Sequence, residues 1–348
     1  MQLKSSRYPG IDKRVLEIVQ NNLDFGYAKD ANGRIAVEMA TPQNKAAINS
    51  EYLWYGRYRV AESRPEHTSA TCYVFKAFDE ENVDDAGNAA PVALKLMRMK
   101  GHFMREINAR KHDFSVDYVV DIVARFPATD DEVGSWPDIA GADTNERLNI
   151  TKAEAEKFFC IVMPLANRNM FVAFKQERFA GRNMEEVKHV FVQLVKCVEH
   201  MHSKGVLHAD LKTLNVVRIN TQWKLLIDMD ATCVIGQDPV GFKSSSAYVP
   251  PEAIFVNETR TKACVRSVEC SEYELLSSHE SFDVWSLGSI LYQMCNSDVK
   301  PLFQGGQDDN LSADIAEDDS LYRLERWDAG TKAKKLQRIP DPLAKNLL

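Results

Sequence analysis

The sequence has 348 residues, of which 45% are hydrophobic and 27% are charged. This composition is typical of a folded protein and excludes a disordered or collagen-like chain. Lys and Arg number 43 against 50 Asp and Glu, so the formal net charge of -7 gives no general attraction to nucleic acid or to an anionic membrane. No apolar run approaches the roughly 18 residues of a membrane-spanning helix. We therefore expect neither a nucleic-acid nor a membrane partner.

The 7 cysteines are scattered along the chain and include no Cys-x-x-Cys pair. This pattern implies neither a zinc site nor a disulfide framework. The first residues contain several basic side chains but no long apolar core, so no secretory signal is visible. A reducing compartment fits this cysteine usage best, and we predict a cytoplasmic protein.

Residues 1–50 are predicted to form a separate helical cap. Apolar side chains recur at 15–19 and again at 36–40, and the turn signal Asn32-Gly33 lies between these helical stretches. The segment 30–41, DANGRIAVEMAT, resembles the last unit of an ankyrin array, which implies a surface for a protein partner. The alternative is an ordinary helical hairpin that packs on the next domain.

Residues 51–166 are predicted to be rich in strands. β-branched and aromatic side chains indicate strands over 58–60, 71–75, 91–96, 118–126 and 158–163. A short helix is expected over 103–110. The acidic stretch 127–157 interrupts this pattern with many Asp, Gly and Pro residues, so it is predicted to be a polar insertion or loop.

Residues 167–348 are predicted to be mainly helical. Apolar residues spaced by three and four positions predict an amphipathic helix that starts near 184 and ends at Gly205. Short strands are expected over 216–219 and 224–227. The segment 283–295 is apolar nearly all round, which predicts a fully buried helix, and 253–282 is expected to be a solvated insertion. The whole is an α+β architecture with a β-rich lobe, a helical lobe and a cleft between them.

The segment His208–Asn215 carries the chemistry, because it places Asp210, Lys212 and Asn215 on one loop between a helix and a strand. Further along, Asp228 ends an apolar strand. Phosphoryl transfer needs a carboxylate beside the attacking hydroxyl, an amide and a second carboxylate for Mg²⁺, and a lysine that offsets charge on the transferred group. Each residue alone would favour an ordinary helix-to-strand turn with polar surface side chains.

The order and spacing of these residues resemble the eukaryotic protein kinase family over roughly residues 54–348. The motifs that carry the resemblance are HxDLKxxN at 208–215, V-A-I-K as Val92–Lys95, D-F-G as Asp228–Asp230, A-P-E as Pro250–Glu252 and D-x-W-S-x-G at 283–288. The resemblance implies a bilobal protein-kinase-like fold that uses ATP and Mg²⁺ and acts on protein substrates.

The resemblance implies roles for individual residues. Asp210 would be the catalytic base, Lys212 would contact the transferring phosphate, and Asn215 and Asp228 would ligate Mg²⁺.

Lys95 would hold the α- and β-phosphates and pair with Glu106. Met163 falls at the gatekeeper position, so the Pro164 carbonyl and the Ala166 amide would bind adenine. A lysine two positions after the catalytic aspartate implies Ser/Thr specificity, and the family subgroup would be the tyrosine-kinase-like one.

The sequence departs from the family pattern at several positions. Residues 61–71 lack the glycines that let backbone amides approach phosphates, so Ser63, Arg64, Thr68 or Ser69 would have to substitute. In the D-F-G position, Met229 would fill the Phe site and Asp230 would have to tolerate left-handed geometry.

Ala209 replaces the arginine that pairs with a phosphate on the activation segment. We therefore expect activity that does not depend on phosphorylation of that segment.

Three functions remain open at this point: an active Ser/Thr kinase, a pseudokinase or scaffold that uses the fold without catalysis, and an interaction protein that recognises partners through residues 1–50. The last helices of the family are missing after 348, including an arginine that pairs with the glutamate matched by Glu252. We expect that Glu252 is a buried carboxylate without its partner. We also expect that the chain is a fragment of a longer protein, or a naturally clipped kinase of low stability.

Overall fold

The computed structural model describes residues 52–62, 64–69, 71–139, 150–225, 228–296, 298–306 and 308–348. The ankyrin-like stretch predicted within 1–50 lies outside these residues. The contacts divide the chain into two compact units, each described by itself below. Unit 1 contains the described residues up to Phe103 together with Ile122–Leu165, and unit 2 contains Met104–Asp121 and Ala166–Leu348. The lobe boundaries expected from the sequence remain predictions.

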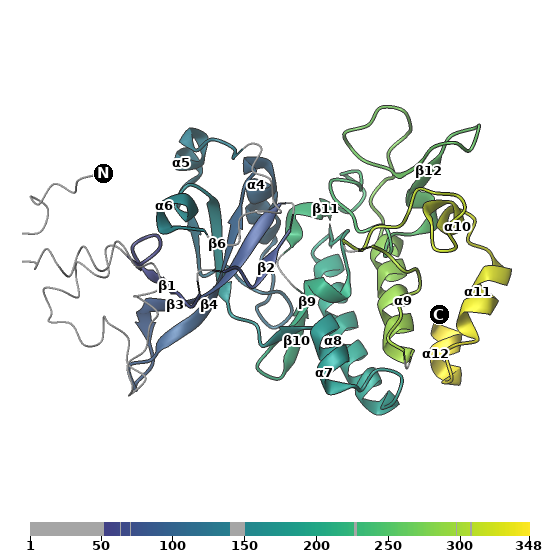
Figure 1. The fold of residues 1–348 in the computed structure, drawn as a ribbon, viewed down its shortest axis with the longest axis horizontal. Helices are drawn as coiled ribbons and strands as arrows, with labels where there is room; N and C mark the ends of the chain where they lie inside the picture. The colour runs from purple at the N-terminus through teal and green to yellow at the C-terminus, as the bar shows by residue number, and fades with distance from the viewer. Residues whose placement is uncertain are drawn as a thin grey trace, which may run out of the picture. The chain divides into compact units, whose positions relative to one another are not determined.

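Unit 1 is built on an antiparallel sheet with the strand order β1-β3-β4-β6-β5, and β2 pairs with the free part of β3 (Figure 1). The strands are β1 (Tyr58–Val60), β2 (His67–Thr68), β3 (Cys72–Val83), β4 (Ala89–Met97), β5 (Ala124–Phe126) and β6 (Phe159–Pro164). Side chains along β3 alternate between buried and half-exposed, as the period of two in a strand requires. Aromatic and branched side chains from these strands form a core of their own.

The strand and loop predictions for 118–157 were wrong in part; residues up to Asp121 belong to unit 2, and those from Ile122 belong to unit 1. Only Ala124–Phe126 of the predicted strand 118–126 is a strand, because Tyr118 and Val119 form a turn whose amides both donate to the carbonyl of Ser115. The predicted loop 127–157 contains the short helices α5 (Asp130–Ser135) and α6 (Lys152–Ala155). Each begins at a threonine followed three residues later by a glutamate, the capping box that satisfies the first amides of a helix.

The helix α4 (Lys100–Ala109) begins in unit 1 and continues into unit 2 along the chain, three residues earlier than the predicted start. It leads into the 3₁₀ turn η1 (Arg110–His112).

Unit 2 has two long helices at its centre, α8 (Met184–Ser203) and α9 (Ser281–Cys295), which lie side by side (Figure 1). The predicted amphipathic helix is confirmed as α8, whose apolar positions are buried, and the Asn183 side chain caps its first turn. Shorter helices complete the unit: α7 (Met170–Glu177), α10 (Leu321–Glu325), α11 (Ala329–Leu336) and α12 (Pro342–Leu347). No helix in the described part of the chain is long and apolar enough to cross a bilayer.

Small strand pairs and 3₁₀ turns connect the helices of unit 2. The strands are β7 (Arg168–Asn169), β8 (Val206–Leu207), β9 (Val216–Ile219), β10 (Gln222–Leu225), β11 (Cys233–Val234), β12 (Ile254–Val256) and β13 (Ala263–Val265), and the turns are η2 (Thr213–Asn215), η3 (Met229–Ala231) and η4 (Pro251–Ala253). They form the sheets β10-β9-β7, β11-β8 and β12-β13. The hairpin β12-β13 corrects the prediction that 253–282 is only a solvated loop, since Ile254 and Ala263 are buried.

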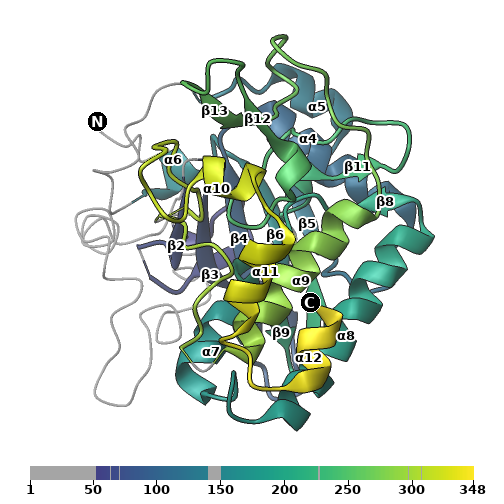
Figure 2. The same ribbon diagram turned by 90° about the vertical axis from the view of Figure 1, so that its right-hand side faces the viewer.

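The prediction that 283–295 is buried on all sides is wrong in part. Most of α9 is buried, but the side chain of Val284 is 56% exposed and that of Trp285 is partly exposed. Figure 2 shows α11 in front of this face of α9, and the Tyr292 hydroxyl of α9 donates to the Lys335 carbonyl of α11 at 3.3 Å. The apolar face therefore packs partly against the last helices and partly opens to a cavity described below.

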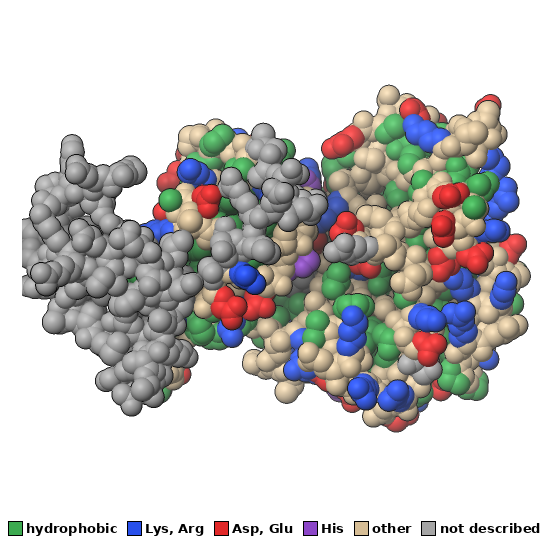
Figure 3. Space-filling view, viewed as in Figure 1, with side chains coloured by type: hydrophobic (Ala, Val, Ile, Leu, Met, Phe, Trp, Pro, Cys, Tyr) green, Lys and Arg blue, Asp and Glu red, His purple; other side chains and the backbone are tan. Residues whose placement is uncertain are grey.

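The outer surface of α11 is basic. Lys332, Lys334 and Arg338 are exposed, and Figure 3 shows blue side chains along the edge of unit 2 where α11 lies. Lys335, by contrast, donates to Asp319 at 2.8 Å and to the Leu302 carbonyl at 2.6 Å, so it holds the helix in place.

Candidate active site

The predicted catalytic loop, residues 208–215, is fixed by one carboxylate from another element. Asp283, in the first turn of α9, is fully buried and accepts hydrogen bonds from the amides of His208 at 2.8 Å and Ala209 at 3.0 Å. Its Oδ2 also lies 2.9 Å from Nε2 of His202 on α8. Ala209 has φ +63°, a left-handed conformation that a non-glycine residue adopts only when its surroundings hold it there. These bonds supply that hold, so α9 determines the shape of the loop.

Asp210 is the most distinctive group of this loop. Its side chain is fully buried, and its Oδ2 lies 3.3 Å from Nδ2 of Asn215 and 3.7 Å from Nζ of Lys212. The Asn215 amide also donates to the Asp210 carbonyl at 2.9 Å, which fixes both side chains on one turn. Among the described residues, Oδ1 of Asp210 has no hydrogen-bond partner although it is buried. Burial raises the pKa of Asp210, and the charges of Lys212 and Lys243 oppose this rise.

Lys212 connects the catalytic loop to the chain that follows Asp228. Its Nζ donates to Oγ of Ser245 at 2.7 Å. The same segment is tied down again at Tyr248, whose hydroxyl lies 3.3 Å from Oγ1 of Thr213 and donates to Gln293 of α9 at 3.2 Å. The end of this segment is therefore held by both the catalytic loop and α9.

Asp228 lies just before η3 and is bound to a lysine that the sequence analysis did not single out. Nζ of Lys243 donates to Oδ2 of Asp228 at 2.5 Å and to Oδ1 of Asp230 at 3.1 Å. Asp230 is not among the residues with positive φ, so the expectation that it must tolerate left-handed geometry is wrong. It lies in the 3₁₀ turn η3, whose backbone conformation does not require glycine. Compared with the glycine of the family motif, Asp230 therefore adds a carboxylate to the site.

Glu106, on the part of α4 that belongs to unit 2, is fully buried. The Arg110 side chain lies against it: Nη1 donates to the Glu106 carbonyl at 2.8 Å, and Nη2 lies 3.7 Å from Oε1. Burial lowers the pKa of Arg110 to about 10, while the charges of Glu106 and Asp228 oppose this change. Sequence analysis missed Arg110, although the spacing of four residues on a helix is the signal for such a pair. The pairing of Glu106 with Lys95 stays a prediction.

Unit 1 holds Lys95, Met163 and Pro164 on neighbouring strands. Lys95 on β4 faces Ile161 on β6, and Met163 faces Ala93. Since residues opposite each other and residues two apart share a face of the sheet, Lys95 and Met163 lie on the same face. Both are buried. Ala166, the first residue of unit 2 after this strand, is half-buried.

The glycine-free segment 61–71 is described in part, since Ser63 lies outside the described residues. Oγ of Ser69 accepts hydrogen bonds from the amides of Thr71 at 3.3 Å and Cys72 at 3.2 Å. Ser69 thus stabilises its own turn, and the expectation that its hydroxyl replaces a glycine amide stays a prediction. Thr68 is exposed on β2.

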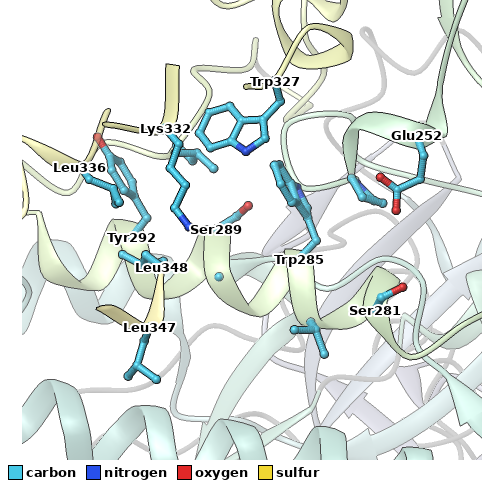
Figure 4. A pocket seen from close by; sticks show the side chains of 14 residues that line it. Glu252, Ser281, Trp285, Ser289, Tyr292, Trp327, Lys332, Leu336, Leu347 and Leu348 are labelled. Carbon is cyan, nitrogen blue, oxygen red and sulfur yellow. The ribbon is translucent and has the colours of Figure 1, made fainter. Parts of the chain in front are cut away.

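A cavity of about 410 Å³ lies in unit 2 against the open face of α9. Figure 4 shows Trp285, Trp327 and Tyr292 around it, with Lys332 and Glu252 among its lining residues. Glu252 is exposed, which corrects the expectation that it is a buried carboxylate. Because water reaches it, its charge needs no buried partner.

Comparison with known proteins identifies the family. The protein kinase domain model matches residues 146–347, more than half of the chain, and the chain belongs to this family. The serine/threonine-protein kinase PKH3 of Eremothecium gossypii is 31% identical over 147 residues, which cover 39% of this chain and 17% of that protein.

Two further relatives are serine/threonine kinases by name. The probable serine/threonine-protein kinase yakA of Dictyostelium discoideum is 24% identical over 196 residues, which cover 56% of this chain and 12% of the relative. Serine/threonine-protein kinase Nek3 of Mus musculus is 27% identical over 169 residues, which cover 47% of this chain and 29% of the relative. The matches thus span less than a third of the length of each of these relatives.

Proposed function

We propose that this chain is a Ser/Thr protein kinase that transfers the γ-phosphate of Mg-ATP to protein hydroxyls. The observation that carries the proposal is the environment of Asp210. One of its oxygens is held by Asn215 and lies near Lys212, whereas Oδ1 is a buried acceptor without a partner among the described residues. A buried acceptor of this kind is costly unless a ligand satisfies it, and a substrate hydroxyl would do so.

In the proposed reaction the substrate oxygen bonds to the γ-phosphorus, the bond from that phosphorus to the bridging oxygen breaks, and ADP leaves with the electron pair. Asp210 takes the hydroxyl proton. The raised pKa of Asp210 makes it a better proton acceptor than an exposed aspartate. Lys212, 3.7 Å from Asp210, would offset the negative charge of the transferring phosphate.

The residues present fit a magnesium ion. Asn215 and Asp228 offer an amide oxygen and a carboxylate, and Mg²⁺ prefers oxygen ligands and takes few of them from the protein when phosphates are present. In the described part of the chain, no group of three or more His, Cys, Asp or Glu side chains is placed to hold a metal. Asn215 and Asp228 would hold the ion, which would supply positive charge to neutralise the phosphates.

Lys95, Met163, Pro164 and Ala166 are the residues that we propose for nucleotide binding, with Glu106 as the partner of Lys95. The shared sheet face of Lys95 and Met163 supports this assignment, since one side of the sheet would then present both to the nucleotide.

The test is transfer of ³²P from γ-labelled Mg-ATP to a general protein substrate by the wild type and by Asp210→Asn. Because loss of a catalytic base typically costs about 10²- to 10⁴-fold, we expect a loss in this range. The matched control is Asp314→Asn, which changes an exposed aspartate of unit 2 in the same way and should retain full activity. Equal transfer by the wild type and Asp210→Asn would contradict the proposal.

A second candidate, a pseudokinase or scaffold module, is favoured by specific observations. Residues 61–71 contain no glycine, and the Asp228 carboxylate is paired with Lys243. A thermal-shift titration with Mg-ATP on the wild type and Lys95→Met separates the possibilities. A shift without phosphate transfer would indicate a nucleotide-binding pseudokinase, and no shift would indicate a module that does not bind nucleotide.

The finer features of the proposal rest on the sequence. Lys212 stands two positions after Asp210, where Ser/Thr kinases carry a lysine, and this supports Ser/Thr specificity. The ankyrin-like stretch within 1–50 supports a protein partner and membership of the tyrosine-kinase-like group. The cysteine usage supports a cytoplasmic location. Fractionation of cells that express a tagged chain would test the location.

A further inference from the structure

The ion pairs around Asp228 are unusual because one lysine serves two carboxylates. Nζ of Lys243 is 2.5 Å from Asp228 and 3.1 Å from Asp230. The exposed fractions of these side chains are 22% for Lys243, 17% for Asp228 and 1% for Asp230. Ion pairs withdrawn from water are screened less than those on the surface. The Lys243 ammonium therefore offsets much of the negative charge of Asp228 and Asp230.

Asp230 is well placed to keep the lysine nearby. It is almost fully buried, and its backbone carbonyl accepts a hydrogen bond from Nε of Arg105 on α4 at 2.9 Å. The Arg105 guanidinium lies 5.4 Å from the ring centroid of Phe242, the residue before Lys243. The backbone of η3 and the segment at 242–243 are therefore anchored to the same arginine, and the two stay close if Lys243 moves.

A divalent cation at Asp228 would repel the ammonium that now occupies this carboxylate. Two cations at one oxygen repel strongly in a site of reduced dielectric constant. Asp230 offers the displaced ammonium a second carboxylate, to which it is already hydrogen bonded.

We propose that Lys243 is an internal counter-ion that competes with a divalent cation for Asp228, and that Asp230 receives its ammonium when the cation binds. This proposal rests on the proposed function in one respect, since it takes Asp228 as a metal ligand. It regulates the site in two ways. Lys243 weakens metal binding, and metal occupancy changes the position of a residue two places before Ser245, which accepts the Lys212 hydrogen bond.

Binding of Mn²⁺ alone to the complete chain tests the proposal, with isothermal titration calorimetry as the readout and no nucleotide present. Lys243→Met removes the ammonium and keeps a long side chain, and it should bind Mn²⁺ about tenfold more tightly, as loss of a charge-assisted hydrogen bond would give. Asp230→Asn removes the second carboxylate to which Lys243 is hydrogen bonded, so it should bind Mn²⁺ severalfold more weakly than the wild type.

The controls test whether the effect arises at Asp228 and whether each variant is folded. Lys334→Met removes an exposed lysine of unit 2 and should leave Mn²⁺ binding unchanged. Lys243→Met combined with Asp228→Asn should lose the gain in affinity. Thermal melts of each variant establish that it is folded before its affinity is compared.

Equal affinity of the wild type and Lys243→Met would overturn the proposal. So would a gain that persists without Asp228, or no measurable Mn²⁺ binding by any variant. The outcome is separate from the kinase proposal: a Lys243 effect in a chain that transfers no phosphate would support the counter-ion and reject the kinase. Phosphate transfer without a Lys243 effect on Mn²⁺ affinity would support the kinase and reject the counter-ion.

Discussion

The catalytic loop and the segment around Asp228 are held in different ways. In the catalytic loop, backbone amides are fixed by Asp283, and the Asp210 carboxylate is positioned by Asn215 of the same turn. Around Asp228, the carboxylates are held by the side chain of Lys243. Backbone bonds to a buried acceptor define one geometry, whereas an ammonium on a flexible stem can move between partners. The first region thus has one defined geometry, and in our proposal the geometry of the second depends on which cation binds Asp228.

The largest effect on stability is expected from Asp283→Ala, which removes the acceptor that supports residues 208 and 209. The amides of His208 and Ala209 would lose their acceptor in a buried setting, and we expect a loss of about 3 kcal/mol in the free energy of unfolding. Phosphate transfer should fall about 100-fold, because a shift of about 1 Å in a catalytic group has effects of this size.

Urea unfolding and transfer assays on the same preparation check this prediction. Asp283→Asn retains one acceptor oxygen and should lose less stability than Asp283→Ala. If the alanine variant were as stable as the wild type, α9 would not determine the shape of the loop.

Ser246→Ala tests the far end of the segment that follows Asp228. Oγ of Ser246 accepts a hydrogen bond from the Leu311 amide at 2.7 Å, and both residues are buried. An orphaned buried amide costs about 1–3 kcal/mol, so we expect a destabilisation of that order in urea unfolding. An unchanged free energy of unfolding would show that this end of the segment is not fixed.

Asp210→Asn should stabilise the chain modestly at neutral pH, although it lowers the proposed activity strongly. Burial raises the pKa of Asp210 above its ordinary value of 3.8. The folded state therefore prefers the protonated form: the stability linked to it is present below pH 3.8 and is lost as the pH rises through the raised pKa.

The asparagine variant carries no such charge, so its Tm should exceed that of the wild type at neutral pH, and the difference should shrink as the pH falls. Thermal melts of both proteins from neutral pH down toward pH 3.8 check the prediction. A lower Tm for Asp210→Asn at neutral pH would mean that the buried charge is fully compensated by Lys212 and Asn215.

The smallest effect is expected from Ser244→Ala. Ser245 and Ser246 are buried, which leaves Ser244 as the partly exposed serine of this run. Since Ala209 replaces the arginine that would bind a phosphate on this segment, removal of the Ser244 hydroxyl should leave phosphate transfer within about twofold of the wild type. A loss above tenfold in a folded variant would restore a role for phosphorylation here.

The sequence predicted the parts of the molecule that depend on local patterns. The helix α8 and the strand β1, in which the burial of Tyr58, Arg59 and Val60 alternates, were predicted because burial of one face imposes these spacings. The closeness of Asp210 and Asn215 could also be predicted locally, since near neighbours on one loop must lie close together, whereas their catalytic roles stay a prediction.

Contacts between distant segments could not be predicted in this way. No spacing connects Lys243 with Asp228, and the segment between them contains no repeating pattern. The open face of α9 was also missed, because an apolar helix surface looks the same in sequence whether a neighbouring helix or a cavity faces it. The turn at Tyr118 was missed because its side chain favours a strand while its amide bonds to Ser115.

The most direct test of the central claim is the identity of the amino acid that receives phosphate. The wild type and Asp210→Asn would be incubated with γ-³²P-labelled ATP, Mg²⁺ and a mixed protein substrate, and the hydrolysed products would be separated as phosphoamino acids. The account predicts label on serine and threonine with the wild type and loss of that label with Asp210→Asn. Label that is equal in the two proteins, or label on tyrosine alone, would contradict it.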